Sequence, residues 1–451
     1  MQTTLGPDDV AAQAERLRAA NERFARRYPG EGGARQPVHT VYGGAQLFRH
    51  DSTVKLGQVA RRALDEYAPD AGTLAAALGI AGGAFAERVY GRVTEKLARE
   101  PVEDFRIDYE DGYGNRPDAE EDGHARSVAR EVAKGLAEGT LPPFLGIRVK
   151  TLSEELRGRS IRTLDLFLTT LVEATGGALP PNFVLTLPKV ALPEQVEYFA
   201  AVLEALEPRL GLASGALRFE IMVEVPQAII GADGRCMLPE LVGAGGGRIT
   251  AAHFGTYDYT AGVGITAAHQ HMRHRACDYA KHAMQVSLAG TGIWLSDGST
   301  TVMPVPVHRA AAGSPLSAGQ VEENRAGVHR AWKLHYDDVR HSLVGGFYQG
   351  WDLHPAQLPT RYAAVFAFFL ESVDSAGARL KNFLEKAAQA TLVGDVFDDA
   401  ATGQGLLNYF LRGINCGALT EQEALEMTGL TLDELRGRSF LRILDSRRLL
   451  G

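Results

Sequence analysis

The stretch DFRIDYEDGYG, residues 104–114, reads as a short buried strand whose end is crowded by three carboxylates, Asp108, Glu110 and Asp111. Like charges this close together repel one another unless a cation neutralises them. An isolated acidic turn closed by glycines is the simpler interpretation. The pattern of the rest of the chain decides between that turn and a functional site.

Seven further short apolar or β-branched runs share the character of this strand, and longer amphipathic stretches separate most of them. Alternating strands and helices indicate parallel β/α units, and eight strands favour a closed barrel. We therefore expect an α/β fold, a modified (β/α)8 TIM barrel. An open doubly wound sheet is the alternative, but no GxGxxG follows an early strand. The eight runs are VHTVYGGAQLF (38–48), DFRIDYE (104–110), FLGIRVK (144–150), FVLTLPK (183–189), RFEIMVE (218–224), ITAAHFGTYD (249–258), TTVMPVP (300–306) and GFYQGWDLHP (346–355).

Chemically interesting side chains stand at the carboxyl ends of six of these predicted strands. In a (β/α)8 barrel all such ends meet on one face, so residues far apart in the chain can share one pocket. One charged residue after an apolar run is unremarkable, but six such strand ends out of eight favour a site. The residues are Asp108 with Glu110 and Asp111, then Arg148, Lys189, Glu224, Asp258 and His354.

Three segments of different character divide the chain. Residues 1–35 are charged and predict an N-terminal helical arm, residues 36–360 carry the barrel pattern, and residues 361–451 predict a C-terminal helical extension. Within the extension, Thr420 and Glu423 have the Thr-x-x-Glu spacing of a helix N-cap.

The composition excludes several classes of partner. The 451 residues include 47 Lys plus Arg against 55 Asp plus Glu, which gives a formal net charge of −8 and a pI of about 5.9. This balance argues against nucleic acid or an anionic membrane as the main partner. The polar start, and a longest apolar run (362–370) far shorter than a bilayer span, predict a soluble cytoplasmic protein. Three separated cysteines fit a reducing compartment.

Six short segments carry a recognisable order along the chain. They are DYEDG (108–112), GIRVK (146–150), LPKV (187–190), IMVEVPQAI (221–229), FGTYDYTAGVG (254–264) and DLHPAQLP (352–359). Their joint order and spacing resemble the citrate lyase β-subunit family, which belongs with the HpcH/HpaI aldolases and malyl-CoA lyases in the pyruvate/phosphoenolpyruvate barrel superfamily. The resemblance spans roughly residues 38–360.

The resemblance implies a divalent metal, usually Mg²⁺ with Mn²⁺ as an alternative. Its protein ligands would be Glu224, which ends the fifth strand, and Asp258, which follows the sixth. Two carboxylates completed by water and substrate oxygens suit a hard cation of this kind. Without a metal, Glu224 is a strand-end charge and Asp258 is a turn residue.

The acidic loop lies beside the metal in the family, which implies that Glu110 and Asp111 are held by the cation and by Arg148. Arg148 resembles the arginine that grips a substrate carboxylate, a contact suited to its planar fork. A structural ion pair with the acidic loop is the alternative, and the two roles are compatible. Arg148, Glu110 and Asp111 are therefore the candidate catalytic residues, and Asp108 is expected to orient the loop.

Further candidates for substrate binding are Lys189, Gly255, Thr256, His354 and Gln357. Lys189 matches a family lysine near the barrel mouth, or is a strand-end lysine that reaches solvent. Gly255 and Thr256 bring backbone N–H groups to a substrate oxygen, or form a turn. His354 and Gln357 lie near the thioester in relatives that use coenzyme A, or cap the last helix.

Three departures from the family pattern weigh against a coenzyme A thioester as the substrate. Lys150 replaces the usual asparagine after the arginine, the first strand lacks the common arginine-serine pair, and residues 305–345 are longer than average.

The segment AHQHMRHRACDYAKH contains four histidines, His269, His271, His274 and His282. His271 and His274 have the spacing of a shared helical face. Carboxylate or cysteine ligands at zinc spacing are lacking, so a partly exposed helix face is a simpler account than a second metal site.

The resemblance implies a Mg²⁺-dependent carbon–carbon lyase or aldolase that acts on a 2-oxo acid or a 3-hydroxyacyl-CoA type substrate through a metal-stabilised enolate. One alternative is a phosphotransferase that uses phosphoenolpyruvate or pyruvate on the same barrel, although no Walker or kinase-type glycine loop is present. A non-catalytic binding protein is another, against which the pair Glu224 and Asp258 argues. By analogy with relatives that are trimers or hexamers, we expect a homo-oligomer with a small-molecule substrate.

Overall fold

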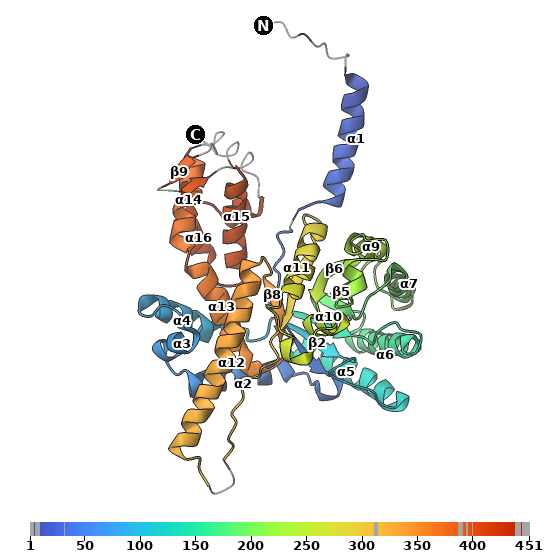
Figure 1. Cartoon of the computed structure of the whole chain (residues 1–451). Helices are drawn as coiled ribbons and strands as arrows, with labels where there is room; N and C mark the ends of the chain where they lie inside the picture. Colours follow the sequence, from blue (N-terminus) through green and yellow to red (C-terminus); the bar gives the residue numbers. More distant parts are fainter. Residues whose placement is uncertain are drawn as a thin grey trace.

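The computed structural model describes residues 4, 10–30, 32–310, 314–386, 391–393, 396–398, 400–437 and 443. Its centre is a closed barrel in which strands β1 to β8 follow one another in sequence order, all parallel (Figure 1). The expected modified (β/α)8 barrel is therefore confirmed. The strands are β1 (His39–Gly44), β2 (Asp104–Asp108), β3 (Phe144–Arg148), β4 (Phe183–Leu187), β5 (Phe219–Val223), β6 (Ile249–Phe254), β7 (Trp294–Ser299) and β8 (Gln349–Asp352).

Helices between the strands cover the outside of the barrel, each through one apolar face. In α6, for example, Leu164, Phe167, Leu168 and Leu171 recur at helical spacing and are all buried, and the Phe167 ring stacks on Phe183 of β4. The helices of this layer are α2 (Ser52–Tyr67), α3 (Ala71–Leu78), α4 (Ala84–Arg99), α5 (Asp118–Glu138), α6 (Arg157–Thr175), α7 (Pro193–Arg209), α8 (Pro226–Ile229), α9 (Leu238–Ala244), α10 (Thr256–Gly262), α11 (Arg275–Leu288) and α12 (Ala318–Val344).

The seventh strand is β7, Trp294–Ser299, so the prediction of a strand at residues 300–306 was wrong. The predicted run contains two prolines, which cannot donate a backbone hydrogen bond to a sheet. The strand β7 does not read as an apolar run, because its polar residues are buried together with hydrogen-bond partners from other elements. Asp297 accepts hydrogen bonds from Nζ of Lys281 at 3.0 Å and from Oγ of Ser342 at 2.6 Å.

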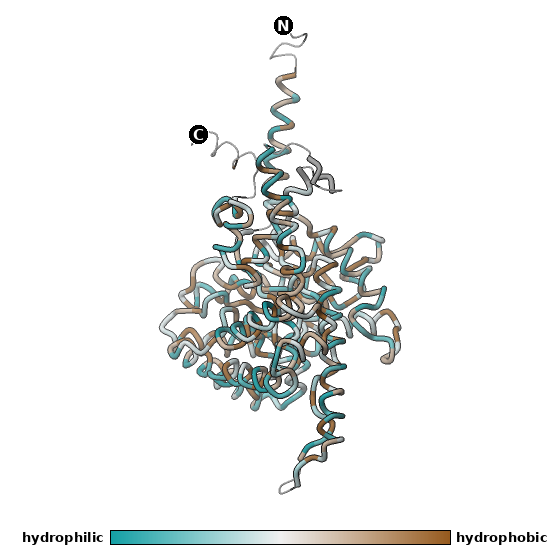
Figure 2. The backbone as a smooth tube through the Cα atoms, turned by 90° about the vertical axis from the view of Figure 1, so that its left-hand side faces the viewer, coloured by the Kyte–Doolittle hydropathy of each residue, from teal (hydrophilic) through white to brown (hydrophobic). Residues whose placement is uncertain are grey.

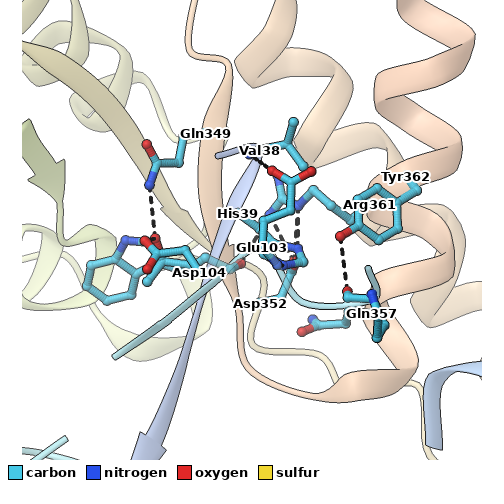
Figure 3. A network of polar contacts seen from close by, with 12 residues as sticks. Val38, His39, Glu103, Asp104, Gln349, Asp352, Gln357, Arg361 and Tyr362 are labelled. Atoms are coloured by element: carbon cyan, nitrogen blue, oxygen red, sulfur yellow. Dashed lines mark hydrogen bonds and ion pairs between the residues drawn. The ribbon is translucent and has the colours of Figure 1, made fainter. Parts of the chain in front are cut away.

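A buried polar network joins the last strand to the first strand and to the outer helices (Figure 3). The Asp352 carboxylate lies 3.0 Å from Nδ1 of His39 and 2.9 Å from Nε2 of His335, and it accepts a 2.9 Å hydrogen bond from Arg361. Burial opposes ionisation, but Arg361 and His335 outweigh it and hold the pKa of Asp352 well below its usual value. The network therefore locks the seam at which β8 meets β1.

The chain ends form two structures outside the barrel. Helix α1 (Ala11–Arg27) extends away from the barrel and buries none of its residues (Figures 1 and 2). The C-terminal helices stand beside the barrel and include an antiparallel strand pair that the sequence did not predict. The elements are α13 (Leu358–Leu370), α14 (Val373–Glu385), β9 (Thr391–Val393), β10 (Val396–Asp398), α15 (Ala400–Asn415), α16 (Glu421–Thr428) and α17 (Leu432–Gly437).

The predicted N-cap in the extension is confirmed, since Oγ1 of Thr420 accepts a hydrogen bond from the backbone N–H of Glu423 at 3.1 Å. Among the described residues, no helix combines the length and the apolar character needed to cross a membrane.

Candidate functional site

The carboxyl ends of β2 to β6 bring most of the predicted site residues to one face of the barrel. Asp108 and Arg148 are the last residues of β2 and β3 and are direct partners in the parallel ladder. Lys189 follows β4 after one intervening residue, Glu224 directly follows β5, and Asp258 lies in the first turn of α10 after β6. Parallel strands thus gather side chains that are far apart in the chain.

Asp108 holds both Arg148 and the acidic loop. Nε and Nη2 of Arg148 donate to the two Asp108 carboxylate oxygens at 2.7 and 2.6 Å, and both side chains are buried. The same carboxylate accepts the backbone N–H groups of Glu110 at 3.0 Å and Gly112 at 2.7 Å. Asp108 therefore orients the loop as expected, and one edge of the Arg148 fork is already occupied.

The other edge of Arg148 faces the remaining carboxylates of the loop. Its Nη1 lies 3.0 Å from Oε2 of Glu110 and 3.6 Å from Oδ2 of Asp111, and its guanidinium carbon lies 4.8 Å from the centroid of the Tyr42 ring. Burial opposes the charge, but Asp108 and Glu110 outweigh it and raise the pKa of Arg148. The structural ion pair is thus present, and a substrate carboxylate would meet only the Nη1 side of the fork.

Lys189 lies at the centre of a carboxylate cluster, which consists of Glu110, Asp111, Glu224 and Asp258. Its Nζ donates to Oε1 of Glu110 and lies 3.4 Å from Asp111 and 3.5 Å from Asp258. Its backbone has a φ of 51°, a left-handed conformation that is strained for a residue with a side chain. That conformation directs its N–H to Oε1 of Glu224 at 2.7 Å. Lys189 therefore joins four carboxylates, rather than simply reaching solvent at a strand end.

Glu224 is a buried carboxyl group among other negative charges, with only 2% of its surface exposed. Burial, together with the charges of Asp258 and Glu110, raises the pKa of Glu224 to about 8, although Lys189 opposes the shift. Its position depends on Gly255, because a Cβ atom on that residue would stand 2.3 Å from Oε2 of Glu224.

The backbone N–H of Gly255 does not serve a substrate oxygen as expected, since it donates to the carbonyl of Val223 at 3.0 Å. It is part of the ladder between β5 and β6. Thr256 is a different case, because its hydroxyl is buried and has no hydrogen-bond partner within the described part of the chain. The hydroxyl packs against Gly298 of β7, where an added Cβ would stand 2.1 Å from Oγ1.

The two acidic loop residues have opposite pKa shifts. Burial and the charge of Asp111 raise the pKa of Glu110 despite Arg148 and Lys189. Asp111 is more exposed, and Arg148 with Lys189 outweighs burial and lowers its pKa. Oε2 of Glu110 is buried and has no hydrogen bond to any described residue, although Nη1 of Arg148 lies nearby. Carboxyl groups with such different environments are suited to different roles in proton transfer.

The donor set fits a hard divalent cation bound by few protein ligands. Among the described residues, no group of three or more His, Cys, Asp or Glu side chains is disposed to hold a metal. The expected pair Glu224 and Asp258 offers two carboxylates, and water and substrate oxygens would have to complete the coordination of Mg²⁺. Lys189 contacts Glu224 through its backbone N–H and Asp258 through its ammonium group, so a metal held by both carboxylates would lie beside this residue.

His354 and Gln357 cap the helical segment after β8. Nδ1 of His354 accepts the N–H of Ala356 at 3.1 Å, and burial lowers the pKa of His354. The amide oxygen of Gln357 accepts the N–H groups of Leu353 and His354, and its nitrogen donates to the carbonyl of Thr300 at 2.9 Å. Both residues therefore have the expected capping role, and their part in substrate binding stays a prediction.

The four histidines do not form a helical face. Helix α11 begins at Arg275, and His274 is its N-cap, with Nδ1 accepting the N–H of Ala276 at 3.1 Å. His271 lies in the preceding loop, with its ring 5.7 Å from that of His274. The prediction of a shared helical face was therefore wrong, because the helix starts one residue after His274.

Two residues support the site without having been predicted. Tyr42 of β1 lies beneath Arg148, and nothing in the run HTVYGG distinguishes it. Nζ of Lys150 donates to the carbonyl of Tyr109 at 2.5 Å and lies 3.0 Å from Glu121, so it fixes the acidic loop from behind. Lys150 stands where the family usually has an asparagine, and this difference in the sequence indicated a particular role for it.

Comparisons with known proteins extend this description. The model of a family described as a domain of unknown function, DUF6986, matches residues 17–443. The search of curated proteins finds no match. Among solved structures, a citrate lyase from Burkholderia xenovorans LB400 matches with a TM-score of 0.54 and 19% identity, over 77% of this chain and 94% of that chain. At that identity the likeness shows the fold alone.

Two structures of malate synthase from Haloferax volcanii are more distant matches. The lead(II) complex has a TM-score of 0.45 and 15% identity, over 84% of this chain and 88% of that chain. The magnesium and glyoxylate complex has a TM-score of 0.43 and 13% identity, over 83% of this chain and 97% of that chain.

Proposed function

The chain belongs to the DUF6986 family, and we propose that the face formed by the carboxyl ends of its barrel strands catalyses metal-dependent cleavage or formation of carbon–carbon bonds. The observation that carries the proposal is the environment of Glu224. This carboxyl group is buried beside Asp258 and Glu110, which is unfavourable unless a proton or a cation compensates the charge. Strongly shifted carboxyl groups of this kind are typical of functional sites.

The order of motifs that resembles the citrate lyase β-subunit family supports the same reaction class, and relationship to the HpcH/HpaI aldolases is part of the proposal. The substrate would be a 2-oxo acid. We favour it over a coenzyme A thioester because Gln357, the residue expected near a thioester, is buried and bonded entirely to backbone groups. A homo-oligomer without nucleic acid or membrane partners completes the proposal.

Each charged residue of the cluster has a role in this reaction. Glu224 and Asp258 would hold Mg²⁺ or Mn²⁺, which when bound supplies Lewis-acid polarisation of the substrate carbonyl. Arg148 presents Nη1 to the substrate carboxylate while Asp108 fixes the rest of its fork. Lys189, whose ammonium group contacts Glu110 and Asp258, would place a second cation beside the substrate.

Glu110 is the residue best suited to accept the hydroxyl proton that retro-aldol cleavage requires. Its raised pKa brings it closer to neutrality, where a general base works best, and its Oε2 has no hydrogen bond to a described residue. Asp111 keeps its charge, since its pKa is lowered, and it balances Arg148 and Lys189.

Calorimetric titration with Mg²⁺ tests the metal site. We expect Glu224→Gln and Asp258→Asn each to weaken binding by roughly tenfold or more, because each removes one charged ligand. Glu87→Gln, on the exposed surface of α4, is the matched control and should bind as the unchanged protein does. Undiminished Mg²⁺ binding by both site variants would refute the assignment.

A substrate panel tests the chemistry. We expect release of pyruvate or glyoxylate from one or more 2-oxo-3-deoxy acids in the presence of Mg²⁺, and loss of turnover in Glu110→Gln with Mg²⁺ binding retained. The panel also includes malyl-CoA, citramalyl-CoA and citryl-CoA. No product from any of these with either Mg²⁺ or Mn²⁺ would exclude the lyase.

A further inference from the structure

The opposite end of the barrel has a cavity of about 730 Å³. The residues that begin the strands line it, so it lies at the amino end, away from the carboxylate cluster. They include Asp104, Phe144, Phe183, Ile249, Trp294 and Gln349. Its size is that of a pocket for a small organic ligand.

The floor of this cavity is charged. Arg106 donates through Nε and Nη2 to the two oxygens of Glu220, each at 2.9 Å, and through Nη1 to Asp104. All three side chains are at least 98% buried. Figure 3 shows Asp104 with Gln349 on one side of the strands, and the outer network of His39, Glu103 and Arg361 on the other.

Such a floor is unusual for a barrel, whose interior is normally filled by branched apolar side chains. Burying three charges is unfavourable, and well-packed apolar residues of similar volume often give equal or greater stability. Here the charged layer also leaves the space above it empty. The arrangement is therefore poorly explained by stability and better explained by binding.

The floor holds two carboxylates, Asp104 and Glu220, which face one permanent positive charge, the guanidinium of Arg106, and the ring of His253. Burial and the charge of Glu220 raise the pKa of Asp104 although Arg106 opposes the shift. A further positive charge above this floor would be stabilised.

His253 of β6 adds an unsatisfied polar group that lines the same cavity. It is fully buried, and neither ring nitrogen has a hydrogen-bond partner among the described residues. The nearest carboxylate oxygen, Oε2 of Glu220, lies 3.2 Å from Nε2. Buried polar groups are normally hydrogen-bonded, and Nδ1 of this ring has neither a hydrogen bond nor an ion pair with a described residue.

We propose that the amino-end cavity is a binding site for a small organic cation, a primary amine or guanidinium group on an apolar body. The cation would lie over Asp104 and Glu220 and donate a hydrogen bond to His253. Its apolar body would contact the walls, where Phe144, Phe183, Val184, Ile249, Ile293 and Trp294 gather. The site is separate from the proposed lyase site and does not depend on it.

Calorimetric titration of the full chain with benzylamine, benzyl alcohol and benzoate tests this proposal. The three probes share one apolar body and differ in charge. We expect benzylamine to bind roughly tenfold or more tightly than benzyl alcohol, and benzoate not to bind. Arg27 and Arg218 are exposed at the rim of the cavity and would attract an anion. Benzoate is therefore a demanding control for the expected preference for a cation.

Two variants locate the binding. Gly243→Trp fills the cavity from its wall on α9, where an added Cβ meets no atom within 4 Å, and should abolish benzylamine binding. Gly91→Trp, at an equally open and exposed position on α4, is the matched control and should bind normally. His253→Phe keeps the shape of the ring and should remove the preference for the amine over the alcohol.

Three results would each overturn the proposal: no binding of benzylamine, benzoate binding as tightly as benzylamine, or benzylamine binding that Gly243→Trp leaves unchanged. Because Gly243 is exposed and makes no contact in the floor, this variant remains informative even where His253→Phe fails to fold.

Discussion

Replacing Glu224 by glutamine should stabilise the metal-free protein at alkaline pH. In the folded chain its pKa is about 8, against 4.5 for an ordinary glutamic acid, because burial and neighbouring carboxylates disfavour its charge. The glutamine amide keeps the shape and an oxygen that can accept the N–H of Lys189. It never takes on the charge that the site disfavours.

The direction of the pH effect follows from proton binding. Between pH 4.5 and pH 8 the folded chain holds a proton on Glu224 that the unfolded chain has released. The contribution of this group to stability is therefore fully present below pH 4.5 and is lost as the pH rises to about 8. The two pKa values differ by about 3.5, and a difference of one corresponds to about 1.4 kcal/mol. The stability lost over this pH range is therefore about 5 kcal/mol.

Urea unfolding of both proteins at pH 5, 7 and 9 in the presence of a chelator measures the effect. The free energy of unfolding of Glu224→Gln, relative to the unchanged chain, should rise by about 4 kcal/mol between pH 5 and pH 9. Added Mg²⁺ should reverse much of the loss in the unchanged chain, since the cation replaces the proton. A relative stability that stays constant within about 1 kcal/mol over this range would show that Glu224 does not carry the shifted pKa.

Three further changes test the packing that positions the site. Gly255→Ala should cost about 1–3 kcal/mol in urea unfolding and weaken Mg²⁺ binding, because its Cβ would stand 2.3 Å from Oε2 of Glu224; unaltered binding would contradict this. Gly146→Ala should prevent the barrel from closing, since its Cβ would stand 1.7 Å from a carbonyl oxygen of β4, whereas Gly158→Ala on α6 meets no neighbour and should leave the circular dichroism spectrum unchanged. Thr420→Ala should cost about 1 kcal/mol through loss of the α16 cap, seen as a lower Tm, with Thr420→Ser expected to retain most of the stability.

The alternation of strands and helices could be predicted because it is written locally in the sequence. Seven of the eight strands lie within predicted runs, since each buried strand reads as a short apolar segment. The exception is β7, whose Asp297 is buried only because Lys281 and Ser342 meet it from neighbouring helices. Those partners lie on other elements, so the strand's own sequence gives no sign of them.

The candidate site, like the fold, could be predicted from the sequence only in part. The carboxylates, Arg148 and Lys189 could be placed on one face because barrel topology brings strand ends together. Which edge of Arg148 stays open depends on the position of Asp108, and the central place of Lys189 depends on a left-handed backbone. The capping role of Gln357 likewise requires the carbonyl of Thr300, which comes from the end of another strand.

By itself, the sequence determined the barrel, because hydrophobic periodicity and strand length are properties of each segment. It also determined which charged residues share the carboxyl end of that barrel. Only the tertiary structure decided how those charges pair, and that Arg106, Glu220 and His253 form a charged floor under a cavity at the other end. Pairing and cavities depend on distances between elements that are remote in the chain, and such distances exist only after the barrel has closed.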